Sequence, residues 1–202
     1  AEDVGHAGVM AKASLADLER RGISRFHLCG HSMGGAIACM IALRAADVVQ
    51  SLTLLAPGGF GFEIHHKALR RYGSATDTDT LSIASKDMMA ARHKPDATVL
   101  TALADARRQE GATEALMAIL HSFLLEREGR TGQGSLPLSA FMTLAVPTRL
   151  LWGTEDKILP VAQAKNVWPG AELTLIDGAG HMLMEEASDA VARAMEASVS
   201  LG

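Results

Sequence analysis

One serine in this sequence stands where a nucleophile would stand. Ser32 lies at the centre of Gly30-His31-Ser32-Met33-Gly34, a glycine-x-serine-x-glycine pattern between a short apolar run and a segment rich in glycine and alanine. When this pattern joins a strand to a helix, the sharp turn pushes the serine oxygen out at the carboxyl end of the strand. We therefore expect small residues on both sides of Ser32, and an N–H of Met33 that can donate to an oxyanion at the start of the helix. The alternative is an ordinary glycine-rich turn.

A serine hydroxyl is a poor nucleophile at neutral pH and needs a base. His181 is the candidate base, because it follows Gly178-Ala179-Gly180 in a loop between the last strand-like run and the last helix-like segment. A loop at the carboxyl end of a parallel strand faces the same crevice as Ser32. For four other histidines, a surface or packing role is a better explanation than catalysis: His6, His27, His93 and His121.

The imidazole in turn needs a carboxylate that fixes its tautomer and stabilises its charged form. Asp156 is the candidate, because it comes just past the strand-like run that ends at Trp152. Glu155 and Asp177 compete for this role. A carboxylate in such a loop can also be a solvated charge or a turn former, and we favour Asp156 as the acid.

Short apolar runs alternate with helix-like segments on either side of these residues. Strands of this kind, separated by helices, predict an α/β fold with a parallel sheet covered on both faces. The strands are expected at 26–29, 51–56, 148–152 and 172–176, and the helices at 3–21, at 33–46, after Pro160 and at 184–199.

Between residues 62 and 142 the pattern changes. No strand-like run is found there, and three helices are expected at 80–92, 96–109 and 113–128, followed by a glycine-rich loop at 129–137 that we interpret as a hinge. We therefore divide the chain into a partial core, residues 1–60 and 143–202, and a helical cap, residues 61–142.

Four basic residues near the start of this cap allow two interpretations. His65, His66, Arg70 and Arg71 can face an anionic substrate, or they can form a solvated helix face. The second interpretation is preferred.

Composition favours small-molecule chemistry. The 202 residues carry a net charge of −4 and 48% apolar residues, so no basic surface for nucleic acid or anionic lipid is expected. No apolar run is long enough to span a membrane, and residues 1–15 lack the pattern of a signal peptide, so we expect a cytoplasmic protein. Cys29 and Cys39 are expected to be buried and reduced, without metal-site spacing, and no metal or cofactor is predicted.

Three segments together resemble the α/β-hydrolase superfamily, in which serine, acid and histidine follow one another in the order Ser32, Asp156, His181. The resemblance runs from the first helix onward, and its motifs are Gly30–Gly35, Leu151–Asp156 and Gly178–His181. It implies an α/β-hydrolase fold with a catalytic triad.

Within this superfamily, the chain looks most like the hydrolase-like domain of the acetoin dehydrogenase acyltransferase component. The segments that carry this likeness are 51–57, 61–64 and 180–182. Related enzymes that cleave carbon–carbon bonds of dienoic ring-cleavage products usually have Asn before the serine and Trp after the histidine. Here these positions are His31 and Met182, which counts against that activity.

The superfamily usually has about four strands before the helix expected at 3–21, including a His-Gly-type loop that supplies the second oxyanion donor. These strands are absent from this sequence, so we expect it to be a portion of a longer chain. We also expect the strand at 26–29 to pair with a strand from elsewhere, because a bare apolar edge is prone to aggregation.

The function implied is hydrolysis of a small ester, thioester or lactone through an acyl-Ser32 intermediate. Acyl transfer to coenzyme A or another acceptor would use the same triad. From a different class, the chain can be a catalytically silent binding or assembly module. A homo-oligomer and a place in a multienzyme complex both remain open.

Overall fold

A computed structural model describes residues 6–200 as an α/β fold built on a four-stranded parallel sheet. The strand order is β1-β2-β5-β6, and every neighbouring pair is parallel. The bounds are β1 (Phe26–His31), β2 (Val49–Leu55), β5 (Thr148–Gly153) and β6 (Ala171–Ile176). The predicted fold class is therefore confirmed, and each predicted strand is present with its bounds shifted by at most two residues.

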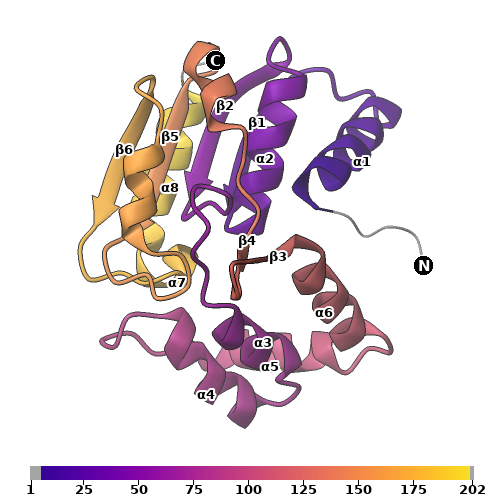
Figure 1. Cartoon of the computed structure of the whole chain (residues 1–202), viewed down its shortest axis with the longest axis vertical. Coiled ribbons are helices and arrows are strands. Elements are labelled where there is room, and N and C mark those ends of the chain that lie inside the picture. The colour runs from indigo at the N-terminus through magenta and orange to yellow at the C-terminus, as the bar shows by residue number, and fades with distance from the viewer. Residues whose placement is uncertain (1–5, 201–202) are drawn as a thin grey trace.

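Helices pack against this sheet from the segments that precede and follow its strands. The helix α2 (Met33–Arg44) contacts β1 and β2 and is itself covered by α1 (Ala7–Arg20). The helix α8 (Ser188–Val199) contacts β2 and β5, and Figure 1 shows it behind the sheet. The start of the helix predicted at 3–21 lies outside the described residues.

Outside residues 62–142, two predicted helices differ in detail, and within that segment the helix predicted at 80–92 ends at Met88. The helix expected at 184–199 is divided at Ala187 into α7 (Leu183–Glu186) and α8. The helix expected after Pro160 is a short 3-10 helix, η2 (Val161–Asn166). A second 3-10 helix, η1 (Leu138–Thr143), precedes β5.

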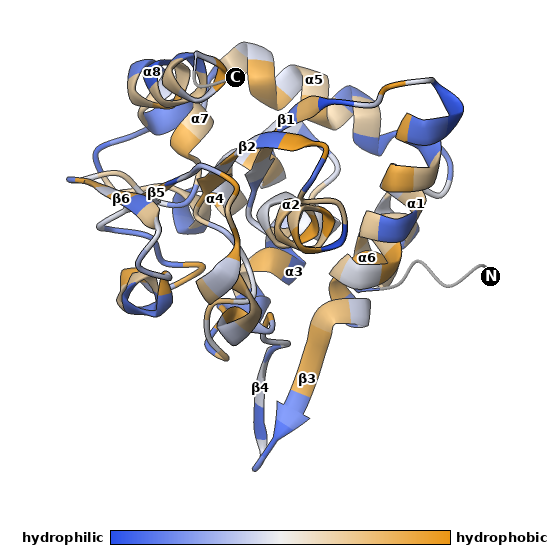
Figure 2. Cartoon of the chain, turned by 90° about the horizontal axis from the view of Figure 1, so that it is seen from above, coloured by the Kyte–Doolittle hydropathy of each residue, from blue (hydrophilic) through white to orange (hydrophobic). Residues whose placement is uncertain are grey.

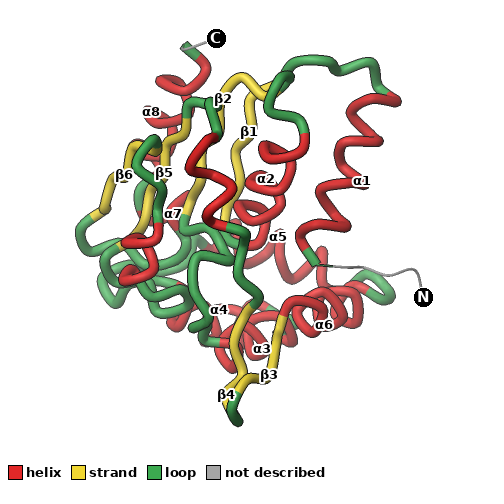
Figure 3. Tube along the Cα trace, turned by 45° about the horizontal axis from the view of Figure 1, so that its top comes forward, coloured by secondary structure: helices red, strands yellow, loops and turns green. Residues whose placement is uncertain are grey.

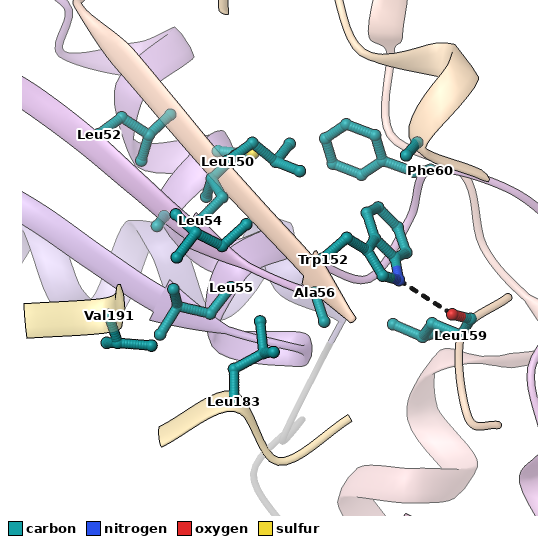
Figure 4. Packing of buried hydrophobic residues seen from close by; sticks show 14 of the residues in the cluster. Leu52, Leu54, Leu55, Ala56, Phe60, Leu150, Trp152, Leu159, Leu183 and Val191 are labelled. Atoms are coloured by element: carbon teal, nitrogen blue, oxygen red, sulfur yellow. Dashed lines mark hydrogen bonds between the residues drawn. The ribbon is translucent and has the colours of Figure 1, made fainter. Parts of the chain in front are cut away.

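The core lies between the central strands and the helices. Leu52, Leu54 and Leu150 are fully buried, and each such side chain contributes about 1.5–3 kcal/mol through its removal from water. Trp152 is also fully buried, and its indole N–H donates to the carbonyl oxygen of Leu159 at 3.0 Å, as Figure 4 shows. This bond satisfies the one polar atom of a side chain that otherwise packs as a hydrophobe.

A group of four helices lies beyond the carboxyl ends of the strands, where the arrowheads in Figure 1 point. It has a small apolar cluster of its own, made of Ala75, Leu81, Ala84, Leu100 and Ala104. We call these helices the helical group: α3 (His66–Ser74), α4 (Thr78–Met88), α5 (Ala97–Arg107) and α6 (Ala112–Phe123).

The prediction that residues 62–142 contain no strand is wrong. After α6 the chain forms an antiparallel hairpin of β3 (Leu124–Arg127) and β4 (Arg130–Gln133), which projects from the helical group in Figure 3. Its two turn residues, Glu128 and Gly129, both have positive φ, which is the geometry that suits a two-residue hairpin. The helix predicted at 113–128 therefore ends at Phe123, and the predicted loop at 129–137 contains β4. In Figure 2 the tip of the hairpin is hydrophilic and its root beside α6 is hydrophobic.

β1 is an edge strand of the described sheet, paired with β2 alone. One prediction about the cysteines is wrong: Cys29, which lies on this edge strand, is exposed. Cys39 is buried in α2, as predicted. No helix in the described residues is long and apolar enough to cross a membrane.

Candidate active site

Ser32 occupies the turn between β1 and α2 in a backbone conformation that few non-glycine residues adopt. Its φ is 53° and its ψ is −119°. The chain can turn so tightly because a Cβ on Gly30 would lie only 2.3 Å from the carbonyl oxygen of Gly34, so only glycine fits there. Gly34 itself has open space around it, and the second close approach is at Gly35, against Pro57. The expectation of a tight fit on both sides of the serine therefore holds for Gly30 and is wrong for Gly34.

The backbone N–H of Met33 is the first of α2 and lies beside the Ser32 side chain. Within residues 6–200 it donates to no other group. The two neighbouring amides after β2 already donate hydrogen bonds within the fold. The N–H of Gly58 donates to the carbonyl oxygen of Ser32 at 2.8 Å, and the N–H of Gly59 donates to Gln133 Oε1 at 3.0 Å. Of these three amides, only Met33 is available to an oxyanion.

His181 and Asp156 form a buried pair at the carboxyl ends of β6 and β5. The Nδ1–H of His181 donates to Asp156 Oδ2 at 2.8 Å, and both side chains are almost completely excluded from solvent. Asp156 Oδ1 accepts the backbone N–H groups of Ile158 and Leu159, each at 2.8 Å. Three donors thus satisfy the carboxylate and hold it against the imidazole.

The competing carboxylates lie elsewhere. Glu155 is exposed, and its backbone N–H donates to the carbonyl oxygen of Ala179. Asp177 is also exposed, and its side chain accepts from the Thr154 hydroxyl at 3.4 Å. Of the three acids considered from the sequence, the structure brings Asp156 to His181.

His31 connects the serine turn with the histidine loop. Its Nε2–H donates to the carbonyl oxygen of His181 at 2.7 Å, and the two imidazole rings lie 4.6 Å apart, centre to centre. Burial, helped by the nearby His181, lowers the pKa of His31 to about 4, so this side chain is neutral at pH 7. Ser32 is next to His31 and so lies near His181. In the described part of the chain, the Ser32 hydroxyl has no hydrogen-bond partner, an arrangement often found in resting enzymes.

A cavity of about 540 Å³ opens beside Ser32 and Met33. The helical group supplies one part of its wall, mostly with apolar side chains such as Leu69, Leu116, Leu120 and Phe123. The rest of the wall comes from residues 6–8, 32–44, 58–64 and 125–137. Among the described lining residues, Arg107 is the buried cation. Its guanidinium donates to three carbonyl oxygens at the end of α3, those of Tyr72, Gly73 and Ala75, so these bonds hold it within the helical group.

The four basic residues considered for an anionic substrate do not line this cavity. His65 accepts the N–H of Ala68 and caps α3. Arg70 contacts His121, and Arg71 forms an ion pair with Asp87. The contacts of His65, Arg70 and Arg71 agree with the preferred interpretation of a solvated helix face. His66 does not fit it, because its Nδ1 is buried and has no partner among the described residues. No cluster of three or more metal-ligating side chains is found among residues 6–200.

Sequence reasoning missed two residues beside this site, His31 and Glu186. His31 stands inside the serine motif, but nothing in the pattern says that its ring meets His181. Glu186 is a buried carboxylate that binds the histidine loop. In the sequence it follows Glu185 in an ordinary helix start, so no signal distinguishes it from a surface acid.

Comparison with curated proteins finds relatives that are about twice as long. The dihydrolipoyllysine-residue acetyltransferase component of the acetoin cleaving system of Cupriavidus necator is 31% identical over 173 residues, which cover 85% of this chain and 45% of that protein. Its counterpart in Pseudomonas putida is 29% identical over 195 residues, covering 95% and 50%. The chain thus spans about half the length of these relatives, and the expected resemblance to this acyltransferase component is confirmed.

Solved structures agree on the fold. A meta-cleavage product hydrolase from Pseudomonas fluorescens superposes with a TM-score of 0.77 at 20% identity, over 99% of this chain and 74% of that one. At this identity the match speaks for the fold alone. The sequence model described as the alpha/beta hydrolase family matches residues 2–194, nearly the whole chain. The chain belongs to the alpha/beta hydrolase family.

Proposed function

We propose that this chain carries the catalytic centre of a serine hydrolase that acts on a small ester, thioester or lactone. The observation that carries the proposal is the buried His181–Asp156 hydrogen bond of 2.8 Å, at the same end of the sheet as the strained turn of Ser32. A base oriented by a carboxylate, next to an otherwise inert hydroxyl, is the arrangement that makes serine nucleophilic.

In the proposed reaction, Ser32 Oγ attacks the substrate carbonyl carbon while His181 Nε2 takes the hydroxyl proton. The carbonyl oxygen becomes an oxyanion, which the free N–H of Met33 stabilises. His181 then gives the proton to the departing alcohol or thiol, which leaves an acyl-Ser32 ester. Water, deprotonated by His181, attacks this ester, releases the carboxylic acid and restores the serine.

Asp156 has a positioning and electrostatic role in this scheme. With Nδ1–H held by the carboxylate, the neutral imidazole has its lone pair on Nε2, the nitrogen that must accept the proton. The same carboxylate stabilises the imidazolium once the proton has moved. The two amides on Asp156 Oδ1 keep the carboxylate from rotating away.

We further propose that residues 61–142 form a cap and that the cavity of about 540 Å³ receives the acyl group. The cavity begins at Ser32 and Met33 and continues between apolar side chains such as Leu116 and Leu120, so it suits a hydrocarbon chain better than a charged group.

Ser32→Ala tests the proposal directly. Removing the attacking oxygen is expected to abolish turnover of a short aryl ester, with a loss on the order of 10⁶ in kcat, while the folded structure is kept. Hydrolysis is measured by release of the phenol, and folding by circular dichroism. A fluorophosphonate should label the wild-type protein and leave the variant unlabelled. Undiminished turnover by Ser32→Ala would refute the assignment.

Acyl transfer is the second candidate, favoured by the acetyltransferase names of the two Cupriavidus and Pseudomonas relatives. It requires the same acyl-Ser32 intermediate, with a thiol or alcohol in place of water. The two candidates differ in the product: with an aryl ester and an added thiol such as coenzyme A, transfer yields a thioester and hydrolysis yields the free acid. A protein that neither turns over esters nor reacts with fluorophosphonate would instead be a binding or assembly module.

A further inference from the structure

A buried carboxylate outside the triad, Glu186, is bound to the backbone of the loop that carries His181. Glu186 is the last residue of α7 and is only 9% exposed. Its Oε2 accepts the N–H of Gly180 at 2.8 Å, and its Oε1 accepts the N–H of Met182 at 2.9 Å. The side chain thus holds the amides on both sides of His181.

The same carboxylate reaches the helical group. Oε2 also accepts the N–H of Ala90, at 2.8 Å, just after α4. The His181 N–H donates to the carbonyl oxygen of Met88 at 3.0 Å, which makes a second link to that segment. One side chain therefore joins the segment after α4 to the histidine loop.

These contacts leave His181 little freedom. Its backbone N–H is bound to Met88, its carbonyl oxygen accepts from His31, and its Nδ1–H is bound to Asp156. Within the described residues, Nε2 is the one polar atom of His181 without a hydrogen bond. That nitrogen is the one the proposed reaction uses.

The packing around Gly180 has no slack. A Cβ at this position would lie 2.5 Å from the N of Ala90 and 3.0 Å from Glu186 Oε1. The loop therefore cannot shift toward the helical group to replace the hydrogen bonds if the carboxylate is removed. Glu186 forms no ion pair with any described residue, so the three amides are what stabilises its charge.

We propose that Glu186 is a positioning residue that fixes the orientation of His181 and couples it to the segment after α4. The proposal rests on the proposed serine-hydrolase function for its kinetic consequence, while its structural part concerns the His181–Asp156 pair alone. Because a displacement of about 1 Å at a reacting group can cost about 100-fold in rate, the loop carrying the base must be held tightly.

Glu186→Gln is the variant of choice, because it preserves shape and removes one acceptor. The amide oxygen can still accept two N–H groups, but its NH₂ group then faces the third donor. We expect kcat for a short aryl ester to fall by about 10- to 100-fold with KM within about twofold, since the cavity is untouched. Glu185→Gln is the matched control on the same short helix. Burial raises the pKa of Glu185, and within the described residues its Oε2 has no hydrogen-bond partner. Replacing this carboxylate by an amide should therefore leave kcat unchanged.

A proton NMR experiment supplies a readout that is independent of turnover. The His181 Nδ1–H bound to Asp156 should give a downfield resonance in the wild-type protein and in Glu185→Gln. In Glu186→Gln this resonance should broaden or shift, while circular dichroism stays near that of the wild type and the melting temperature falls by no more than about 10 °C. Glu186→Asp keeps the charge on a shorter side chain and provides a second test if Glu186→Gln does not fold.

A folded Glu186→Gln protein with unchanged kcat and an unchanged downfield resonance would overturn the proposal. If the wild-type protein and Ser32→Ala show equal activity, the proposed function fails, but the NMR comparison still decides whether Glu186 orders His181. The two failures are therefore distinguishable.

Discussion

Different interactions stabilise two regions of the molecule: the sheet, with the loops that carry Ser32, Asp156 and His181, and the helical group. In the sheet, long apolar side chains such as Leu52, Leu54 and Leu150 fill one continuous core, and polar atoms at the strand ends are bound to backbone groups. The helical group has a small cluster composed mainly of alanine, with surface ion pairs such as Arg71–Asp87. Exposed ion pairs of this kind contribute at most about 1 kcal/mol each.

This difference separates two tasks within one chain. The proposed chemistry requires a serine, a histidine and an acid held in fixed positions, and the loops that carry Ser32, His181 and Asp156 follow strands of the densely packed sheet. In the proposed function the cavity wall must suit a substrate, and part of that wall lies in the helical group, whose weaker core tolerates change. Substitutions in the sheet should therefore damage turnover or folding, and substitutions in the helical group should alter which substrate is accepted.

After Ser32→Ala, the largest effect is expected at the acid. Asp156→Asn keeps the shape but favours the wrong tautomer of His181, so turnover should fall by about 10⁴-fold. Glu155→Gln, one residue earlier and exposed, should leave turnover within about twofold. Both are measured on a short aryl ester. Damage by Glu155→Gln with none from Asp156→Asn would mean that the wrong acid has been chosen.

Matched truncations compare the two cores. Leu54→Ala in the sheet should lower the free energy of unfolding by about 3–5 kcal/mol, and Leu81→Ala in the helical group by about 2–3 kcal/mol, because a small cluster of alanines can close around the gap more readily. Urea unfolding gives both values. Hydrogen exchange should show lost protection confined to the helical group in Leu81→Ala. Equal costs and uniform exchange would show that the two regions unfold as one.

The sequence predicted the first of these regions far better than the second. The apolar runs that end at Gly30 and Trp152 predict strands, and both strands are present. Parallel strands bring the loops that follow them together, which is why Ser32, Asp156 and His181 could be named as candidates. In the helical group, the helix α3 was not predicted, because its sequence His66-Lys67-Ala68-Leu69-Arg70-Arg71 has too few apolar residues to show a helical period. The hairpin was not predicted either, because Leu124 and Leu125 continue the apolar pattern of α6 and make the helix look longer than it is.

A pH experiment probes the link between the serine turn and the histidine loop. The pKa of His31 is about 4 in the folded protein, against an ordinary value of 6.5, because burial disfavours its charged form. Between pH 6.5 and 4 the unfolded chain therefore binds more protons, and the folded state loses stability as pH falls. Relative to His31→Gln, the wild type should lose on the order of 1–3 kcal/mol between pH 7 and 4.5, measured by urea unfolding. Parallel pH curves for the two proteins would contradict this.

The smallest effect tests the cavity. Leu116→Trp places a larger side chain in the wall, so kcat/KM for an octanoyl ester should fall by about tenfold while that for an acetyl ester stays within about twofold. Val99→Trp, on the exposed side of α5 and away from the cavity, is the matched control. If both esters respond equally to Leu116→Trp, the acyl group does not occupy this cavity.

The placement of the tryptophans allows the sheet and the helical group to be followed by different spectroscopic signals. The chain has two tryptophans, Trp152 and Trp168, and both are buried in the sheet core, where Phe60 and Phe141 pack against them. The helical group has none. Tryptophan emission therefore reports on the sheet alone, whereas far-ultraviolet ellipticity is dominated by helices. Melting curves recorded by the two signals on one sample would separate unfolding of the helical group from unfolding of the sheet, without any added label.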